Sequence, residues 1–367
     1  MALIGEADIR MAVDQFGIDG RFIHAEKFGD GHINDTYLVS VEDGNQEIKK
    51  YVLQAVNTHV FKNIVPIMEN IARVTDHLKT KITHDEKVMN FLQAKDGHAY
   101  YIDEKGAFWR IYEFIDDSIC LQLPDTDEDF YECGVAFGKF QRDLSDFPAD
   151  SLYETIPDFH NTPKRYAAFL NAVEQDVCGR AAAVECEIGF VKNRVDFCSV
   201  LEEKYQAGDL PLRVSHNDTK CNNVLLDSRT KKALCVIDLD TIMPGFSVND
   251  FGDAIRFGAS TAAEDERDLS KVHFDMGKFK VYTDGFLAGS GGLLSRAEIL
   301  LLPEGAKMMT LECGMRFLTD YLQGDVYFKT EREGQNLDRC RTQFKLVEEM
   351  ESNWEEMKAY VASFLAK

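Results

Sequence analysis

The chain has 367 residues, of which 45% are hydrophobic and 28% charged, as in an ordinary globular protein large enough for two lobes. Its formal net charge of −22 disfavours nucleic acid or an anionic membrane as a general partner, because both require a positive field. The nine cysteines are scattered without a Cys-x-x-Cys pair, and no apolar run approaches the roughly 18 residues of a transmembrane helix. We therefore expect a cytoplasmic protein, acting as a monomer, that binds neither nucleic acid nor membrane.

The first third of the chain has the pattern of a β-rich domain. An apolar stripe over residues 4–16 predicts a short amphipathic helix at the N-terminus. Residues 22–44 have the pattern of a strand, a Gly-containing loop and a second strand. A third strand is predicted at 49–56, a helix at 62–80 and a further strand at 109–115. An acidic segment around Pro124 then predicts a hinge or linker, so we place the boundary of this part near residues 113–120.

The remaining two thirds are predicted to be mostly helical. An apolar residue recurs every three or four positions from Phe130 to Leu144, and Thr126 or Asp127 is placed to cap that helix. The exception is 212–245, where short β-like runs stand among polar residues. The pattern therefore predicts a small β-rich part followed by a larger α-rich part.

The residues that indicate chemistry are concentrated between 214 and 240. Asp218 and Asn223 stand five positions apart in a short polar loop, and Asp238 follows the apolar run LCVI fifteen positions after Asn223. Phosphoryl transfer requires a carboxylate that orients the acceptor hydroxyl, together with hard oxygen ligands for magnesium. Asp218 is therefore the candidate catalytic base, and Asn223 and Asp238 are the candidate ligands of Mg²⁺.

His216-Asn217-Asp218 matches the His-x-Asp catalytic loop of kinases, in which an Asn five residues after the Asp binds the metal. Within it, we interpret His216 as a residue that holds the loop by packing and a hydrogen bond, rather than as a base. A literal Asp-Phe-Gly also occurs, beginning at Asp250. In protein kinases this tripeptide carries the aspartate that holds magnesium, but a three-letter match alone indicates little.

Taken together, His-Asn-Asp, the following Asn and Ile-Asp-Leu-Asp resemble the aminoglycoside phosphotransferase and choline kinase branch of the protein-kinase-like superfamily. Within that branch the chain resembles the N-acetylhexosamine 1-kinases over nearly its whole length. The stretches that carry this resemblance are GDGHIN (29–34), THVF (58–61), SHNDTKCNN (215–223), VIDLDTIMPG (236–245), DFGDAIRFGAST (250–261), LECGMRF (311–317) and GDVYF (324–328).

The resemblance implies a fold class and a reaction. The fold would be α+β and protein-kinase-like, with a small β-rich N-lobe over residues 1–115 and a larger α-helical C-lobe over 116–367. The reaction would be direct transfer of a phosphoryl group from ATP, with Mg²⁺, to the C1 hydroxyl of N-acetylglucosamine or N-acetylgalactosamine. Asp218 would engage that hydroxyl. The further sugar contacts implied by the resemblance are His32, Asp240, Arg316 and Tyr327.

The resemblance also separates the two candidate metal aspartates. The metal aspartate of this architecture follows the catalytic-loop Asn at a spacing that fits Asp238, whereas Asp250 lies too far along the chain. Asn223 and Asp238 would therefore hold Mg²⁺. Asp250 resembles a downstream structural aspartate and would support the backbone of the catalytic loop by hydrogen bonds.

The Gly-containing loop near residue 30 is the candidate nucleotide-covering segment. Gly29, Asp30 and Gly31 would let backbone amides approach the phosphates of ATP. As a bare pattern the loop fits a plain hairpin turn, but its place upstream of the catalytic loop favours the nucleotide interpretation. The adenine is expected at the hinge strand, with Tyr112 and Phe114 as its contacts.

The lysine expected in the third strand is missing. Gln54 occupies that region, and Lys50 lies four residues earlier with the same side-chain parity. The residue that clamps the ATP phosphates is therefore left unassigned, and a non-catalytic nucleotide-binding module stays an alternative. A second alternative is a kinase of the same fold for homoserine, a choline-like amino alcohol or an aminoglycoside, although Arg316 favours a neutral sugar over a cationic acceptor.

None of the roles above is assigned to a further basic stretch, FHNTPKRY (159–166). It combines His160, Lys164 and Arg165 and could meet a phosphate. A helix start with Pro163 at its first position is the simpler interpretation.

Overall fold

The computed structural model describes residues 4–29, 34–58, 61 and 63–366, and the chain divides into two compact units, Met1–Ser118 and Ile119–Lys367. We refer to them as the N-terminal unit and the C-terminal unit. Among the residues described, no helix has the length and apolar character needed to cross a membrane.

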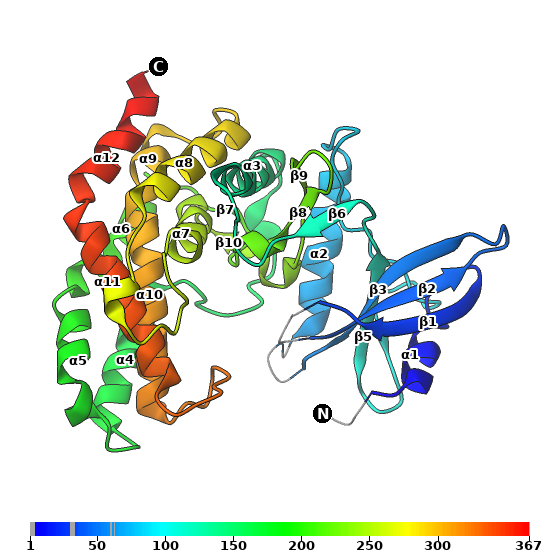
Figure 1. The fold of residues 1–367 in the computed structure, drawn as a ribbon, viewed down its shortest axis with the longest axis horizontal. Coiled ribbons are helices and arrows are strands. Elements are labelled where there is room, and N and C mark those ends of the chain that lie inside the picture. Colours follow the sequence, from blue (N-terminus) through cyan, green and yellow to red (C-terminus); the bar gives the residue numbers. More distant parts are fainter. Residues whose placement is uncertain (1–3, 30–33, 59–60, 62, 367) are drawn as a thin grey trace. The chain divides into compact units, whose positions relative to one another are not determined.

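The N-terminal unit is built on a five-stranded antiparallel sheet with the strand order β1-β2-β3-β5-β4 (Figure 1). Its elements are α1 (Glu6–Val13), β1 (Arg21–Lys27), β2 (Asp35–Glu42), β3 (Ile48–Val56), α2 (Ile64–Lys79), β4 (Tyr101–Ile102) and β5 (Phe108–Glu113). The predicted N-terminal helix, the strands and the helix after them are thereby confirmed, while the short β4 was not predicted.

Alternation along the strands gives this sheet two different faces. One face carries Val39, Leu53 and Trp109, which are buried in a core shared with α1. The opposite face carries Thr36, Gln54 and Arg110, which lie in register on β2, β3 and β5. The strand pattern therefore places a row of polar side chains across three neighbouring strands.

The C-terminal unit is mainly helical and contains two small sheets, one of β7 and β10 and one of β6, β8 and β9. Its helices are α3 (Asp127–Asp143), α4 (Thr162–Gln175), α5 (Glu185–Lys192), α6 (Val200–Gln206), α7 (Ser247–Gly258), α8 (Met276–Ser290), α9 (Arg296–Leu300), α10 (Leu302–Gln323), α11 (Gln335–Ser352) and α12 (Trp354–Ser363). Its strands are β6 (Ser118–Cys120), β7 (Arg213–Ser215), β8 (Val224–Asp227), β9 (Ala233–Val236) and β10 (Met243–Gly245). The predicted α+β fold class, with a small sheet part and a larger helical part, is confirmed.

Helix α3 begins as its sequence predicts. The Thr126 side chain accepts a hydrogen bond from the backbone N–H of Asp129, and the Asp129 carboxylate reaches back to Thr126, which is a capping box. Thr126, rather than Asp127, is therefore the cap. The apolar stripe of the helix, including Phe130 and Phe137, is fully buried.

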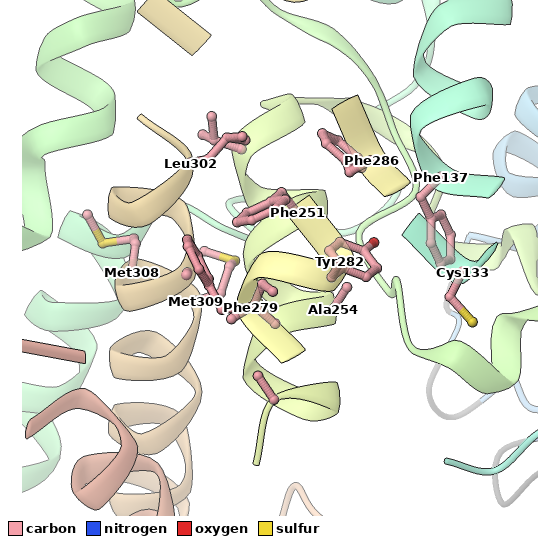
Figure 2. Packing of buried hydrophobic residues seen from close by; sticks show 14 of the residues in the cluster. Cys133, Phe137, Phe251, Ala254, Phe279, Tyr282, Phe286, Leu302, Met308 and Met309 are labelled. Atoms are coloured by element: carbon pink, nitrogen blue, oxygen red, sulfur yellow. The ribbon is translucent and has the colours of Figure 1, made fainter. Parts of the chain in front are cut away.

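The Asp-Phe-Gly tripeptide lies within α7, in the core of the C-terminal unit. Phe251 packs against Phe279, Tyr282 and Phe286 of α8, with ring centroids 5.5–5.9 Å apart (Figure 2). A Cβ atom on Gly252 would stand 2.2 Å from the carbonyl oxygen of Gly305 on α10. Gly252 therefore permits α7 and α10 to approach more closely than any larger residue would allow.

Candidate active site

The predicted catalytic loop, which keeps the name catalytic loop below, runs from the end of β7 to the start of β8, and Asp250 of α7 holds its backbone. The Asp250 carboxylate accepts the backbone N–H groups of His216 (2.9 Å) and Asn217 (2.8 Å), and Gln141 Nε2 of α3 donates to it as well (2.7 Å). Burial raises the pKa of Asp250, and these hydrogen bonds oppose that effect. Because Asn217 has a left-handed backbone (φ 64°), the loop turns sharply at this point.

His216 joins the loop to the segment that follows β9. Its Nε2 lies 2.9 Å from the carbonyl oxygen of Ile237, and its ring packs edge-on against Phe137 and Phe140 at 5.4 and 5.8 Å. The side chain is fully buried. This position gives His216 a packing and hydrogen-bonding environment rather than access to a substrate proton.

Asp218 projects from this fixed loop and remains partly exposed, with 28% of its side chain accessible. Its Oδ1 lies 3.0 Å from Lys220 Nζ, and its Oδ2 accepts a hydrogen bond from Asn223 Nδ2 at 3.1 Å. Burial favours the neutral acid, but the charge and hydrogen bond of Lys220 outweigh it, so the pKa of Asp218 lies below its ordinary value. The carboxylate is therefore ionised at neutral pH and can accept a proton.

The candidate metal ligands lie on the two sides of the β8–β9 hairpin. The backbone N–H of Ile237 donates to the carbonyl oxygen of Asn223 (2.9 Å), which brings the segment around Asp238 beside the loop. Asp238 is exposed and has a left-handed backbone (φ 58°). Asp240, a candidate sugar contact, is 3% exposed. Asn223 uses its amide nitrogen on Asp218, which leaves its Oδ1 as the oxygen suited to a hard cation.

The sequence interpretation missed two groups of this loop. Lys220 forms the ion pair with Asp218, and Asp253 of α7 accepts the backbone N–H of Thr219 (3.0 Å) while also pairing with Arg256 (2.9 Å). The position of Lys220, two residues after the candidate base, could have identified it. Nothing local identifies Asp253, because its contact spans 34 residues.

The candidate nucleotide residues belong to the N-terminal unit. Gly29 follows β1 with a left-handed backbone (φ 73°), whereas Asp30, Gly31 and His32 lie outside the described residues. Phe114 packs edge-on against Phe28, the residue before Gly29, with ring centroids 5.8 Å apart. The start of the Gly-containing loop and the end of the hinge strand are therefore neighbours within this unit.

The third-strand position is occupied by a hydrogen-bonded pair rather than by a lysine. Gln54 Oε1 accepts from Arg110 Nε at 2.8 Å, and Gln54 Nε2 donates to Thr36 Oγ1 at 3.2 Å. Tyr112, a candidate adenine contact two residues after Arg110, is half-buried against Phe91 (5.2 Å). A cation thus lies on the neighbouring strand β5, directly opposite Gln54.

Two candidate acceptor contacts lie together on α10 and the loop after it. The Arg316 guanidinium lies 5.8 Å from the centre of the Tyr327 ring, and 5.5 and 5.4 Å from those of Phe328 and Phe159. Tyr327 is 65% exposed, and the Asp320 carboxylate fixes its backbone N–H at 2.8 Å. The structure therefore presents an arginine among aromatic rings at the surface.

A pocket of about 120 Å³ lies between the catalytic loop and the segment before α4. Asn217 of the loop and Asn249 of α7 line one part of it, and Phe159 and His160 line another. Among the described residues, Asn249 Oδ1 and His160 Nε2 are buried without a hydrogen-bond partner. Buried polar atoms normally have a partner, so these two indicate that the pocket receives polar atoms from a ligand or from water.

Comparisons with known proteins agree with this geometry. Residues 24–282 match the model of the phosphotransferase enzyme family. The fold is similar to that of an aminoglycoside phosphotransferase from Alicyclobacillus acidocaldarius, with a TM-score of 0.65, 11% identity and coverage of 99% of this chain and 98% of the other. It is also similar to a microcompartment-associated aminopropanol kinase (TM-score 0.59, 16% identity, 96% and 99% coverage) and to a choline kinase from Cryptosporidium parvum (0.54, 14%, 94% and 93%). The predicted protein-kinase-like fold is confirmed.

Proposed function

The chain belongs to the phosphotransferase enzyme family, and from this premise we propose that it transfers the γ-phosphoryl group of ATP to the anomeric C1 hydroxyl of an N-acetylhexosamine. The observation that carries the proposal is the environment of Asp218. Its ionised carboxylate stands on a loop whose backbone is fixed by Asp250, and Lys220 and Asn223 fix its two oxygens. A fixed carboxylate of this kind can orient an acceptor hydroxyl and take its proton as the phosphoryl group is transferred.

Lys220 has two consequences for this step. Its positive charge keeps Asp218 ionised, and it adds a cation beside the point where the transferred group would meet the acceptor hydroxyl. Catalysis in phosphoryl transfer depends mainly on positioning and on charge stabilisation. We therefore assign Lys220 a role in both.

The donor set fits a magnesium ion. Among the described residues no group of three or more His, Cys, Asp or Glu side chains is arranged to hold a metal, but magnesium in kinases needs only one or two protein carboxylates in addition to substrate phosphates. Asn223 Oδ1 and the exposed carboxylate of Asp238 would supply these oxygens. The bound ion would neutralise charge on the phosphates of ATP.

The sugar assignment depends on the stretches that resemble N-acetylhexosamine 1-kinases. Arg316 and Tyr327, which that resemblance assigns to the acceptor, lie together in the structure. A guanidinium and an amphipathic ring suit the hydroxyl and acetamido groups of such a sugar. Asp240 and His32 are proposed as further contacts of the same acceptor.

One observation favours a second acceptor class. Glu154, Asp158 and Glu202 line the pocket that also contains Asn217 of the catalytic loop. Acidic side chains suit a cationic amino alcohol, and two proteins of similar fold are named as kinases of aminopropanol and choline. The same chemistry at Asp218 would then act on a different hydroxyl.

A panel of acceptors tests the proposal. ADP release is measured with MgATP and N-acetylglucosamine, N-acetylgalactosamine, choline, aminopropanol, homoserine or kanamycin. We expect release with the two N-acetylhexosamines. Release only with amino alcohols would establish the second class, and no release with any acceptor, with Asp218→Asn equal to the wild type, would favour a non-catalytic nucleotide-binding module.

A further inference from the structure

Two arginines flank Phe159 in the C-terminal unit. Arg165 of α4 donates from Nε and Nη2 to the carbonyl oxygen of Phe159, at 3.2 and 3.0 Å. Arg316 of α10 lies over the Phe159 ring, 5.4 Å from its centre. Both side chains are half-buried. We call Phe159, Arg165, Arg316, Tyr327 and Phe328 the arginine cluster.

These two guanidiniums differ from most arginines of similar burial. The arginines that are at least half-buried and hold a carboxylate in an ion pair are Arg142, Arg180, Arg194, Arg213, Arg256, Arg332, Arg339 and Arg341. Within the described part of the chain, Arg165 and Arg316 have no such ion pair. In a protein with a net charge of −22, two neighbouring arginines that form no ion pair with a carboxylate of the described residues are unexpected.

Two acidic side chains near the cluster, Glu312 and Asp158, make their hydrogen bonds and ion pairs with other residues. Glu312, one turn before Arg316, accepts from Thr162 Oγ1 at 2.6 Å through one oxygen and lies 2.8 Å from His160 Nδ1 through the other. Asp158 pairs with Lys164 at 2.6 Å. Burial and, next, the charge of Arg316 lower the pKa of Arg165, and the negative charges of Glu312 and Asp158 oppose them only in part.

We propose that Arg165 and Arg316 form a subsite for a small oxyanion, a carboxylate or phosphate group, beside the pocket that Asn217 and Phe159 line. Guanidinium groups bind such anions through paired N–H donors, and an anion between two of them would remove their mutual repulsion. The exposed Tyr327 ring gives a ligand access to Arg316 from solvent. This inference rests on the proposed function in one respect, the assignment of Arg316 to the acceptor side.

The position of the cluster relates the anion to the acceptor. Phe159 contacts both arginines and also lines the pocket that contains Asn217 of the catalytic loop. The anion would therefore be either a charged substituent of the acceptor or free phosphate bound next to it.

The stretch FHNTPKRY does begin a helix, because Asn161 caps α4 and Pro163 stands in its first turn. The capped start also places Arg165 at the carbonyl oxygen of Phe159, the residue whose ring lies under Arg316.

Binding of inorganic phosphate to the full chain, measured by titration calorimetry, tests the subsite. We expect Arg165→Gln to weaken phosphate binding about tenfold or more, because a charge-assisted hydrogen bond is lost. Arg165→Lys keeps the positive charge but loses the paired N–H donors of the guanidinium, so it should retain part of the affinity for phosphate. The matched control is Arg296→Gln, an exposed arginine at the start of α9 in the same unit, which should bind phosphate as the wild type does.

The source of the anion is tested with N-acetylglucosamine and N-acetylglucosamine 6-phosphate. Tighter binding of the phosphorylated sugar, lost in Arg165→Gln, would assign the anion to the acceptor, whereas phosphate binding without that gain would assign it to free phosphate. Anion binding that is equal in wild type, Arg165→Gln and Arg165→Lys, with equal thermal unfolding midpoints, would overturn the subsite. If the subsite is overturned but the wild type releases ADP in the presence of the sugar, the proposed function is still supported. If phosphate binding depends on Arg165 but no sugar-dependent ADP release occurs, the subsite is kept and the proposed function is rejected.

Discussion

The catalytic loop and the arginine cluster lie in the same unit but differ in how their charged side chains are partnered. In the loop, Asp218 has an ammonium and an amide on its two oxygens, and the Asp250 carboxylate accepts several donors. In the cluster, Arg165 meets a backbone carbonyl and Arg316 meets aromatic rings. The charged groups of the loop thus have protein partners, whereas the two arginines have no carboxylate in an ion pair within the described residues. Under the proposals above, the loop positions the reacting groups and the cluster contributes to the choice of substrate.

The largest effect on activity should come from a change at Asp218 of the catalytic loop. Asp218→Asn removes the proton acceptor while keeping the shape of the side chain, so sugar-dependent ADP release should fall by about 10²–10⁴-fold. Asp209→Asn, which alters a surface pair with Lys204, is the control and should leave the rate unchanged. An Asp218→Asn rate within a few-fold of wild type would remove the distinction between the loop and the cluster.

The hydrogen bonds by which Asp250 supports the loop should contribute to the free energy of unfolding. Asp250→Ala leaves the backbone N–H groups of His216 and Asn217 and the amide of Gln141 without their acceptor in a buried place. An unsatisfied buried donor costs about 1–3 kcal/mol, so unfolding in urea should show a loss of about 3 kcal/mol or more. A loss below about 1 kcal/mol would mean that the loop does not depend on Asp250.

The packing beneath the loop gives a smaller effect with a matched control. Gly252→Ala would place a Cβ atom 2.2 Å from a backbone oxygen of α10, and overpacking of this kind costs about 1–3 kcal/mol. Gly189→Ala, in the middle of α5 with no atom near its Cβ position, should be neutral or stabilising. Equal unfolding free energies for the two variants would contradict the close approach of α7 and α10.

The most subtle effect concerns pH. Because Lys220 holds the pKa of Asp218 below its ordinary value, the carboxylate stays ionised as the pH falls, and activity that requires it is lost only on passing below that pKa. Lys220→Met should therefore move the acid limb of the kcat/KM profile to higher pH. An unmoved acid limb would show that the ion pair does not set the ionisation of Asp218.

Much of this arrangement could be predicted from the sequence, because it is local. The five-residue spacing of Asp218 and Asn223 and the apolar run before Asp238 depend on a short loop and one hairpin. Those features placed both segments side by side, as the hydrogen bond between Ile237 and Asn223 shows. Their roles in catalysis and metal binding remain predictions.

The rest depends on contacts between distant parts of the chain. Arg165 and Arg316 both reach Phe159 because α4 packs beside α10, and no periodicity in either segment indicates that packing. The hydrogen bond between Gln54 and Arg110 depends on strand register between residues 56 positions apart. Likewise, the tripeptide Asp-Phe-Gly alone does not predict that this segment lies in a buried helix.

The central claim is the position of the transferred phosphate, and phosphorus NMR of the product tests it most directly. The 367-residue protein is incubated with MgATP and N-acetylglucosamine, and the coupling of the new phosphorus resonance is recorded. Transfer to C1 predicts a sugar phosphate whose phosphorus couples to the single anomeric proton. Coupling to the C6 methylene protons, or ADP formation without any sugar phosphate, would contradict the account.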